Sequence, residues 1–416
     1  MSYLVRTVDA ELDELLPLAS AIALDGPKGV GKSATASRRA DHAWFLDDVD
    51  QRVQLEADPL LRDAPPGTLL LDEWQRLPQL WDSVRRQVDA GAPPGRFLLT
   101  GSATPRSGVD THSGAGRILS LRMRPMALHE RGRIASTVSL GALLSGTAGA
   151  VRGATDWTAS NYYEAITASG FPAIHTQAER LRVEMLNAYL QRVVDRDMPE
   201  QGYHVRRPQT LRRWLAAYAA ASSTTTQYSK ILDATTAGDG SQPAKTTTLA
   251  YRDLLTSLWL LDPVPGWAHS RNPFSRLQLA PKHQLADPAL AARLLNISTE
   301  LLSRPRGAAM AGQFFESLAT LSVRVAAQAA RADVGHLRTG NGEHEVDLVL
   351  EGREGQVLGI EVKLAAAVVD RDVRHLLWLR EQLPHDVVDL VVLTTGGAAY
   401  RRPDGVAVVP LALFGA

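Results

Sequence analysis

The residues best suited to chemistry form the octapeptide GPKGVGKS, which runs from Gly26 to Ser33. It follows the pattern G-x-x-x-x-G-K-[ST], with Gly26, Gly31, Lys32 and Ser33 at the fixed positions. Glycines allow the backbone to wrap so that successive N–H groups face an anion at the start of a helix. The octapeptide therefore predicts a phosphate-binding loop.

The nucleotide expected in this loop is ATP with Mg²⁺. Lys32 would reach the β- and γ-phosphates, and the Ser33 hydroxyl would ligate Mg²⁺. An apolar run, AIAL, precedes the loop and a helix-compatible run, ATASRRADHA, follows it, as the motif requires. A glycine-rich turn that binds no nucleotide is the alternative. The expected nucleotide-binding residues are Gly26, Pro27, Lys28, Gly29, Val30, Gly31, Lys32, Ser33 and Ala34.

A pair of acids after the apolar run TLLL supplies the second half of a nucleotide site. Asp72 would hold the water shell of Mg²⁺ together with Ser33, and Glu73 would polarise an attacking water. The alternative is a helix start with two solvated acids. A later run, FLLTGSATP, places Thr100 and Ser102 at a strand end, where either could sense the γ-phosphate or simply be a polar strand end.

The chain as a whole excludes several other kinds of chemistry. It has 416 residues, so we expect two to four domains. Lys plus Arg and Asp plus Glu both number 45, so net charge predicts neither a nucleic-acid nor a membrane partner. Cys is absent, which excludes disulfides, thiolate metal sites and cysteine nucleophiles and suits a reducing compartment. With no signal peptide and no long apolar run, we expect a soluble cytoplasmic protein without a membrane partner.

The elements that must position these residues change character along the chain. From Ala21 to about Ala135, apolar runs alternate with helix-like stretches, as in a parallel sheet covered by helices. Residues 136–155 are rich in Gly, Ser and Ala and predict a linker. Residues 156–280 are mostly helical in pattern. Residues 281–416 combine a helix-like segment with strand-like runs and an amphipathic helix.

Together, the two motifs resemble the AAA-type ATPases, specifically a prokaryotic group with a C-terminal domain of unknown function. The segments GSATP, HSGAGRILSLRMRPMAL, RVVDRDMPEQG and PKHQLADPAL extend this resemblance over nearly the whole chain. AAA proteins often receive an arginine finger from a neighbouring subunit, and Arg117, Arg122 and Arg124 are the candidates here. Surface or interface arginines are the alternative. The resemblance also makes a homo-oligomer or a protein partner an open expectation.

The last part of the chain carries a second constellation of charged residues. Glu316 lies in a helix-like stretch, Asp347 in the run EVDLVLE, and Glu361 and Lys363 share one face of the strand IEVKL. The order of elements resembles the PD-(D/E)-x-K restriction-endonuclease-like fold. That resemblance implies that Asp347 and Glu361 hold Mg²⁺, that Glu316 completes the shell, and that Lys363 activates the water. Surface carboxylates beside a lysine are the alternative.

The middle of the chain predicts three helices followed by a turn, which is typical of a winged helix-turn-helix. Plausible contacts to DNA phosphates are Arg206, Arg207, Arg212, Arg213 and Lys245. The alternative is a set of helices that only packs neighbouring domains together.

The sequence thus predicts an α/β multidomain protein. Its parts would be a P-loop AAA-type ATPase domain with a parallel sheet and helices (1–135), a linker (136–155), a helical lid with a winged-helix-like domain (156–280), and a restriction-endonuclease-like α/β domain (281–416). The leading functional hypothesis is an ATP-hydrolysing protein that acts on nucleic acid, including metal-dependent DNA cleavage. The alternative is a nucleotide-gated regulator or scaffold whose nuclease-like domain is catalytically silent. A metabolic P-loop kinase fits the pattern poorly.

Overall fold

The computed structural model describes residues 3–102, 114–203, 205, 207–235, 244–268, 279–339 and 342–416. The chain divides into two compact units. The N-terminal unit comprises Met1–Arg124, Asp195–Val205 and Asp253–Leu260, and the C-terminal unit comprises Pro125–Val194, Arg206–Arg252 and Leu261–Ala416.

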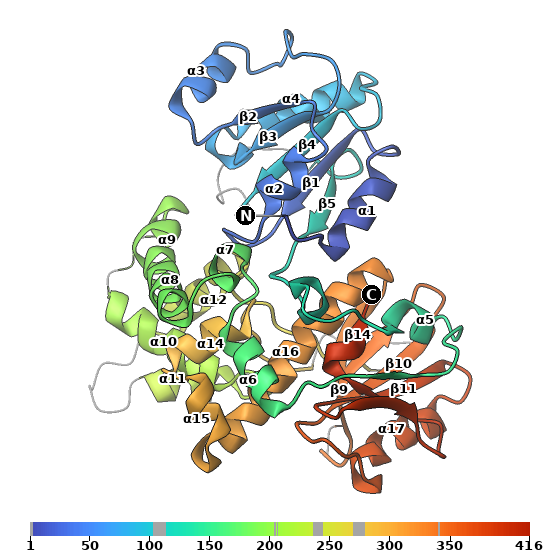
Figure 1. Ribbon diagram of the computed structural model, residues 1–416. Coiled ribbons are helices and arrows are strands. Elements are labelled where there is room, and N and C mark those ends of the chain that lie inside the picture. The colour runs from blue at the N-terminus through green and yellow to red at the C-terminus, as the bar shows by residue number, and fades with distance from the viewer. Residues whose placement is uncertain are drawn as a thin grey trace. The chain divides into compact units, whose positions relative to one another are not determined.

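The N-terminal unit is built on a five-stranded sheet of order β2-β3-β4-β1-β5, in which every pairing is parallel (Figure 1). The strands are β1 (Ala21–Asp25), β2 (His42–Phe45), β3 (Leu69–Asp72), β4 (Phe97–Gly101) and β5 (Leu119–Arg122). Strands β3 and β4 are buried along their whole length, as their continuous apolar runs predict. The predicted parallel sheet of a P-loop ATPase-like α/β fold is confirmed.

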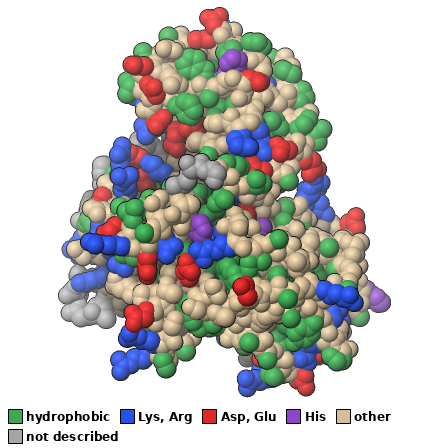
Figure 2. Space-filling view, in the orientation of Figure 1, with side chains coloured by type: hydrophobic (Ala, Val, Ile, Leu, Met, Phe, Trp, Pro, Cys, Tyr) green, Lys and Arg blue, Asp and Glu red, His purple; other side chains and the backbone are tan. Residues whose placement is uncertain are grey.

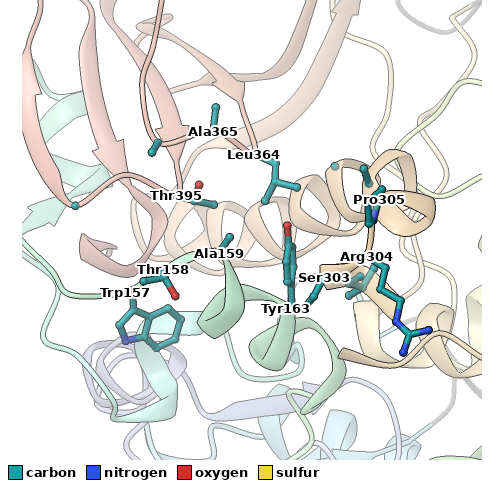
Figure 3. A pocket seen from close by; sticks show the side chains of 15 residues that line it. Trp157, Thr158, Ala159, Tyr163, Ser303, Arg304, Pro305, Leu364, Ala365 and Thr395 are labelled. Atoms are coloured by element: carbon teal, nitrogen blue, oxygen red, sulfur yellow. The ribbon is translucent and has the colours of Figure 1, made fainter. Parts of the chain in front are cut away.

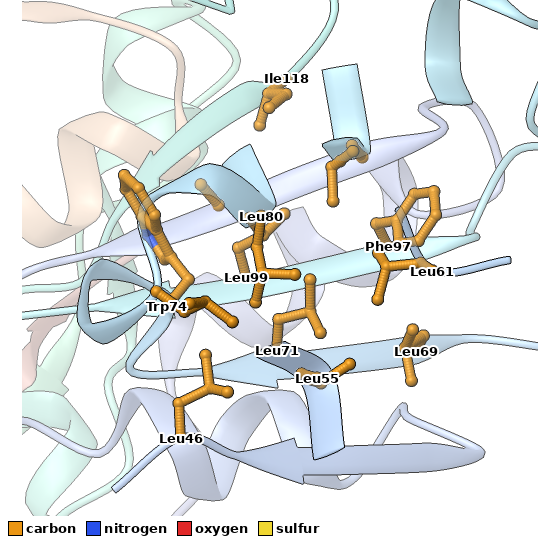
Figure 4. Close-up of a cluster of buried hydrophobic side chains, with 14 residues drawn as sticks. Leu46, Leu55, Leu61, Leu69, Leu71, Trp74, Leu80, Phe97, Leu99 and Ile118 are labelled. Atoms are coloured by element: carbon orange, nitrogen blue, oxygen red, sulfur yellow. The ribbon is translucent and has the colours of Figure 1, made fainter. Parts of the chain in front are cut away.

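Helices cover both faces of this sheet. They are α1 (Thr7–Leu15), α2 (Lys32–Ser37), α3 (Val49–Ala57) and α4 (Gln79–Asp89). On one face, Leu12 of α1 and Ala36 of α2 join the same apolar cluster as Ile22 of β1. On the other face, Leu55 of α3 and Leu80 of α4 pack with strand residues (Figure 4). Strand side chains alternate between the two clusters, so each strand of the centre contributes to both cores.

The C-terminal unit contains a mixed seven-stranded sheet of order β7-β12-β13-β11-β10-β9-β8. Its strands are β7 (Gly153–Ala154), β8 (Asp333–Arg338), β9 (Glu345–Glu351), β10 (Val357–Val362), β11 (Val387–Thr394), β12 (Ala398–Arg401) and β13 (Ala407–Pro410). Strands β8, β9 and β10 form an antiparallel meander, and β11 then returns parallel to β10. Helix α17 (Asp370–Gln382) makes that crossover and packs on one face, while α16 (Ala308–Ala329) packs against β8 and β10.

Residues 136–155, which the sequence predicts to be a linker, are packed into this unit, and that expectation needs correction. They form β6 (Val138–Ser139), α5 (Leu140–Leu144) and β7. Strand β6 pairs with β14 (Phe414–Gly415), and β7 pairs with β12. The small residues suggested a loose connection, but the three leucines of α5 are buried against α16 and the sheet and fix the segment.

The remaining helices lie mostly in the C-terminal unit. They are α6 (Ala159–Thr167), α7 (Pro172–His175), α8 (Glu179–Arg192), α9 (Met198–Glu200), α10 (Pro208–Ala220), α11 (Tyr228–Thr235), α12 (Lys245–Ser257), α14 (Pro288–Leu294) and α15 (Thr299–Ser303). After α12, single antiparallel bridges join Leu261 to Leu285 and Val264 to Lys282. Among the described residues, no helix combines the length and the apolar character needed to cross a membrane.

Candidate functional site

The phosphate-binding loop connects the end of β1 to the start of α2. Gly26, Gly29 and Gly31 have φ values of 155°, 78° and 110°, which L side chains rarely adopt. A Cβ atom on Gly26 would lie 2.1 Å from the backbone oxygen of Met123. The glycine pattern is therefore required by the path of the backbone, and it brings the loop to the first turn of α2.

Lys32 lies at the centre of the loop and is 5 % exposed. Its Nζ donates hydrogen bonds to the backbone oxygens of Gly26 and Pro27, at 2.8 and 3.0 Å. Burial lowers the pKa of Lys32 to about 8, although the carboxylates of Glu73 and two aspartates act in the opposite direction. A buried ammonium held only by carbonyl dipoles fits an incoming polyanion, because phosphate oxygens would complete its charge pairing.

Asp72, the aspartate predicted to serve Mg²⁺, is held by the neighbouring strand. Asp72 ends β3, and it is in parallel register with Thr100 of β4. The Thr100 hydroxyl donates a hydrogen bond to Oδ1 of Asp72, and the backbone N–H of Glu73 donates to the same hydroxyl at 3.4 Å. Both side chains are buried, with 6 % and 1 % exposed. Thr100 thus fixes the orientation of the carboxylate predicted to serve Mg²⁺.

Glu73 follows in a left-handed conformation, with φ of 55°. Such a conformation is uncommon for a residue other than glycine and is often found at functional sites. The Ser102 hydroxyl donates to Oε2 of Glu73 at 3.2 Å, and the Gln75 amide donates to the same oxygen. The two hydroxyls that the sequence left as equal candidates therefore have separate partners, Thr100 with Asp72 and Ser102 with Glu73.

Two residues that support this site were not identified from the sequence. Asp25 ends β1 beside the loop, and burial raises its pKa to about 6, against the lowering effect of Ser120, Lys32 and Arg122. Its position as the last residue before the glycine motif was the available signal.

Arg6 is the second supporting residue, and it is 4 % exposed. Its guanidinium donates to the backbone oxygen of Val30 at 3.0 Å and to that of Arg124 at 2.7 Å. These bonds tie the phosphate-binding loop to the chain after β5. Nothing in the sequence signals this role, since the contact spans 24 residues on one side and 118 on the other.

Lys28, another of the predicted nucleotide-binding residues, is exposed, and its Nζ lies 3.3 Å from Oδ1 of Asp197 in the same unit. Of the arginine-finger candidates, Arg117 pairs with Asp89 at 2.9 Å, and the Arg122 guanidinium lies 4.7 Å from the centre of the Trp259 ring. A role of these arginines in a neighbouring subunit stays a prediction.

The second constellation is brought together in the C-terminal unit. Glu316 comes from α16, Asp347 from β9, Glu361 from β10, and Lys363 follows β10 directly. Lys363 Nζ lies 3.0 Å from Oε2 of Glu361, and the backbone N–H of Val362 donates to Oδ2 of Asp347 at 2.9 Å. All four charged residues that the sequence singled out therefore belong to one cluster.

A fifth charged residue, Lys282, enters this cluster and was not identified as part of it. Its side chain is 2 % exposed, and its Nζ lies 2.9 Å from Oε1 of Glu316 and 3.0 Å from Oδ1 of Asp347. Oε1 of Glu345 lies 3.6 Å away. The only signal was its place in PKHQLADPAL, which the sequence analysis used for resemblance alone.

Neighbouring charges and burial shift the pKa values of the acids in this cluster. Burial would raise the pKa of Asp347, but Lys282 and Lys363 outweigh it and hold that pKa low. Burial and the neighbouring Asp347 raise the pKa of Glu316 and Glu361. In the part of the chain that the structure describes, no group of three or more His, Cys, Asp or Glu side chains is arranged to hold a metal ion. The metal-binding role of Glu316, Asp347 and Glu361 stays a prediction.

A cavity of about 790 Å³ opens elsewhere in the same unit (Figure 3). Aromatic rings from Trp157 and Tyr163, the guanidinium of Arg304 and the segment Leu364–Ala366 line it. The carboxylates of the cluster do not line it. Its lining combines aromatic, polar and basic side chains and could receive a ligand. No described residue of the lining is both buried and charged, so the lining does not indicate the kind of ligand.

The predicted DNA contacts lie on α10 and α12 and before them. Arg207, Arg212, Arg213 and Lys245 are exposed, whereas Arg206 lies outside the described residues. Acidic and basic side chains are intermixed on the face shown in Figure 2. The role of these residues in binding DNA stays a prediction.

Comparison with protein families divides the chain into three matched segments. Residues 19–131 match the family described as "AAA domain". Residues 159–301 match "Domain of unknown function (DUF8612)", and residues 311–414 match "Domain of unknown function (DUF4143)". The N-terminal segment therefore matches the AAA-domain family, and the C-terminal segment matches a family of unknown function, in agreement with the resemblance stated from the sequence.

Relatives and solved structures complete the comparison. Uncharacterized proteins of Mycobacterium tuberculosis (Rv2008c) and Mycobacterium bovis (Mb2031c) are each 26% identical over an alignment of 418 residues, which covers 97% of this chain and 83% of theirs. A Walker-type ATPase of Pyrococcus abyssi is 13% identical, with a TM-score of 0.37, over 69% of this chain and 94% of its own. The ORC2 protein of Aeropyrum pernix, in ADPNP–ADP complexes, is 16% identical, with a TM-score of 0.30, over 73% and 91%. These scores are too low for any functional argument.

Proposed function

We propose that the N-terminal unit binds and hydrolyses ATP. The observation that carries this proposal is the convergence of Lys32, Asp72 and Glu73, with each carboxylate held by its own hydroxyl donor. The AAA-domain match over residues 19–131 supports ATP binding independently of that geometry. Hydrolysis is the further step, and it depends on Glu73.

Each residue has a distinct part in this reaction. Mg²⁺ bound to the Ser33 hydroxyl and, through water, to Asp72 would offset charge on the phosphates. Lys32 binds the β- and γ-phosphate oxygens, for which its ammonium must leave the carbonyls of the loop. Glu73 orients the attacking water and accepts its proton, since Ser102 and Gln75 hold the carboxylate in place. Because the loop glycines carry no side chains, the backbone N–H groups can approach the phosphates closely.

The proposal is tested by measuring ATP binding and phosphate release separately. We expect the Glu73→Gln variant to bind ATP like the wild type and to release phosphate at least about 100-fold more slowly, as loss of a general base predicts. A Glu56→Gln variant, which changes an exposed acid of α3, is the matched control. Hydrolysis that is unchanged in Glu73→Gln would refute the assignment of the base.

Metal-dependent DNA cleavage by the C-terminal unit is the second candidate. The observation that favours it is the convergence of Glu316, Asp347, Glu361 and Lys363. The meander β8-β9-β10, the crossover helix α17 and the parallel strand β11 also follow the order of a restriction-endonuclease-like core. Incubation with supercoiled and linear DNA and Mg²⁺ or Mn²⁺, beside Asp347→Ala, tests it. Absence of cleavage that depends on Asp347 would leave the alternative, a nucleotide-gated regulator with a silent domain.

A winged helix that docks DNA is the proposal for the middle of the chain. Helices α10, α11 and α12, followed by the two antiparallel bridges, support it. A double substitution, Arg212→Ala with Arg213→Ala, should then weaken DNA binding and reduce its dependence on salt. Salt-dependent binding that is unchanged would argue for a packing role of these helices. We also propose that the protein is cytoplasmic.

A further inference from the structure

The position between Glu316 and Asp347 in the C-terminal unit is filled by an ammonium group. Lys282 Nζ lies within 3.0 Å of one oxygen from each carboxylate, and a third carboxylate oxygen, from Glu345, lies 3.6 Å away. Two of the three N–H donors of the ammonium therefore have a carboxylate oxygen at hydrogen-bonding distance, and the Glu345 oxygen adds negative charge farther away. The carboxylates are spaced for N–H···O bonds rather than for the shorter distances, roughly 2.0–2.6 Å, at which oxygens bind Mg²⁺ or Ca²⁺.

The backbone holds Lys282 in this place. Its N–H donates to the oxygen of Val264, and the N–H of Val264 donates to the oxygen of Lys282, both at 2.9 Å. The side chain is 2 % exposed, so the ammonium cannot exchange its partners for water without a movement of the surrounding chain. Lys282 is therefore a built-in cation of the cluster, in contrast to Lys363, whose side chain is 36 % exposed at the rim.

A buried oxygen in the same cluster is left without a partner. Glu361 is 3 % exposed, and its Oε2 pairs with Lys363, whereas its Oε1 has no hydrogen-bond partner in the structure. Buried polar atoms almost always have a partner, so an unpaired carboxylate oxygen indicates a position at which something else can bind. Asp347 raises the pKa of Glu361, so the carboxylate of Glu361 lies close to the carboxylate that Lys282 contacts.

We propose that Lys282 is the resident cation of this carboxylate cluster and that it excludes a divalent metal ion from Glu316, Asp347 and Glu361. Removing its ammonium turns the cluster into a divalent-cation site with oxygen ligands. Oxygens of Glu316 and Asp347 then face the vacated position, and the carboxylate of Glu361 lies close to Asp347. The oxygens of Glu316 and Asp347, at 2.9 and 3.0 Å from the ammonium, need to move inward by less than about 1 Å to reach metal-bonding distance.

The inference does not depend on ATP hydrolysis, and it competes with DNA cleavage as the function of this unit. For the wild-type cluster to cleave DNA with a metal, Lys282 would have to leave the carboxylates first. The same measurement therefore distinguishes the two ideas, since a metal bound by the wild-type cluster would favour cleavage and overturn the inference.

The test measures Mn²⁺ binding to the full-length protein without nucleotide. Bound Mn²⁺ is quantified from the decrease of the free-ion signal in electron paramagnetic resonance. We expect Lys282→Met to bind one Mn²⁺ per chain at least about ten-fold more tightly than the wild type, because an ammonium no longer competes for the carboxylates. Adding Asp347→Asn to Lys282→Met should abolish that binding. The matched control, Lys230→Met, removes an exposed lysine of α11 in the same unit, outside the carboxylate cluster, and should bind like the wild type.

Two results would overturn the inference. One is Mn²⁺ binding by the wild type that disappears in Asp347→Asn, because Lys282 would then not exclude the ion. The other is a folded Lys282→Met protein that gains no binding. If Lys282→Met does not fold alone, the variant Lys282→Met with Glu361→Gln removes one buried acid, and the same gain of binding is expected from the two remaining carboxylates.

Discussion

Thr100 offers the sharpest test of the proposed nucleotide site, because its hydroxyl connects Asp72 with the backbone of Glu73. It donates to Asp72 and accepts from the backbone N–H of Glu73, while its side chain is 1 % exposed. Thr100→Val removes the hydroxyl and keeps the shape. Because the lost bond is to a charged acceptor, we expect a loss of about 1.5–3 kcal/mol in the free energy of unfolding. If the same energy is lost from the transition state, hydrolysis should slow by roughly 10- to 100-fold.

Steady-state phosphate release and ATP titration separate this effect from a general loss of fold. We expect Thr100→Val to bind ATP within about three-fold of the wild type, because Lys32 supplies most of the phosphate contact. The control is Thr100→Ser, which keeps the hydroxyl and loses one methyl group, at a cost of about 1 kcal/mol in stability. It should retain most of the activity. A valine variant as active as the serine variant would refute the claim that this hydroxyl positions Asp72.

Other predictions concern the same unit. Lys32→Ala should weaken ATP binding by at least about 100-fold, because it removes the ammonium that pairs with the phosphates; isothermal titration calorimetry measures this, and unchanged affinity would contradict the loop assignment. Burial lowers the pKa of Lys32 to about 8 from an ordinary 10.5, so ATP affinity should fall as pH rises above 8. In that range ATP binding should also take up a proton, which calorimetry detects as a binding heat that depends on the buffer. Over the window from 8 to 10.5 the unfolded chain binds more protons at this group than the folded chain, so the nucleotide-free protein should gain stability from it as pH rises, which denaturant titration can check. Arg6→Ala should lower the unfolding midpoint and weaken ATP binding through the loss of its bond to Val30, whereas Arg52→Ala, which removes the ion pair with Glu56 on α3, should leave affinity unchanged.

The N-terminal fold could be predicted because its signals are local. Continuous apolar runs such as TLLLD indicate strands buried on both faces, and the glycine pattern indicates the turn that follows the first of them. The C-terminal order of helix, two strands, helix and strand was also visible, since each element has its own periodicity, whereas strand β8 was not identified. Residues 136–155 were misjudged because two-residue strands and a five-residue helix are too short for a periodic pattern, and their burial depends on partners such as Phe414.

The candidate sites were predictable only in part, for a related reason. The two sequence motifs predict that Asp72 and Lys32 belong to one nucleotide site. The hydroxyl partner of each acid, however, depends on the register between β3 and β4. Lys282 could not be assigned to the carboxylate cluster, because its contacts span 34 residues to Glu316 and 65 to Asp347 and because Lys282 itself lies outside the named helices and strands. A lysine in such a segment gives no sign of burial until the fold is known.

The two buried lysines of this protein explain why the two units should differ in what they bind. Lys32 is held by backbone carbonyls, and burial lowers its pKa to about 8, so its charge is only partly compensated within the loop. Lys282 is also buried, but Asp347 and Glu316 outweigh the burial and raise its pKa. The first lysine gains an anionic partner when a nucleotide binds, whereas the second already has its anions and would lose them to a metal ion. On this argument, the N-terminal unit is built to accept an external ligand, and the carboxylate cluster is closed by its own lysine until that lysine is displaced.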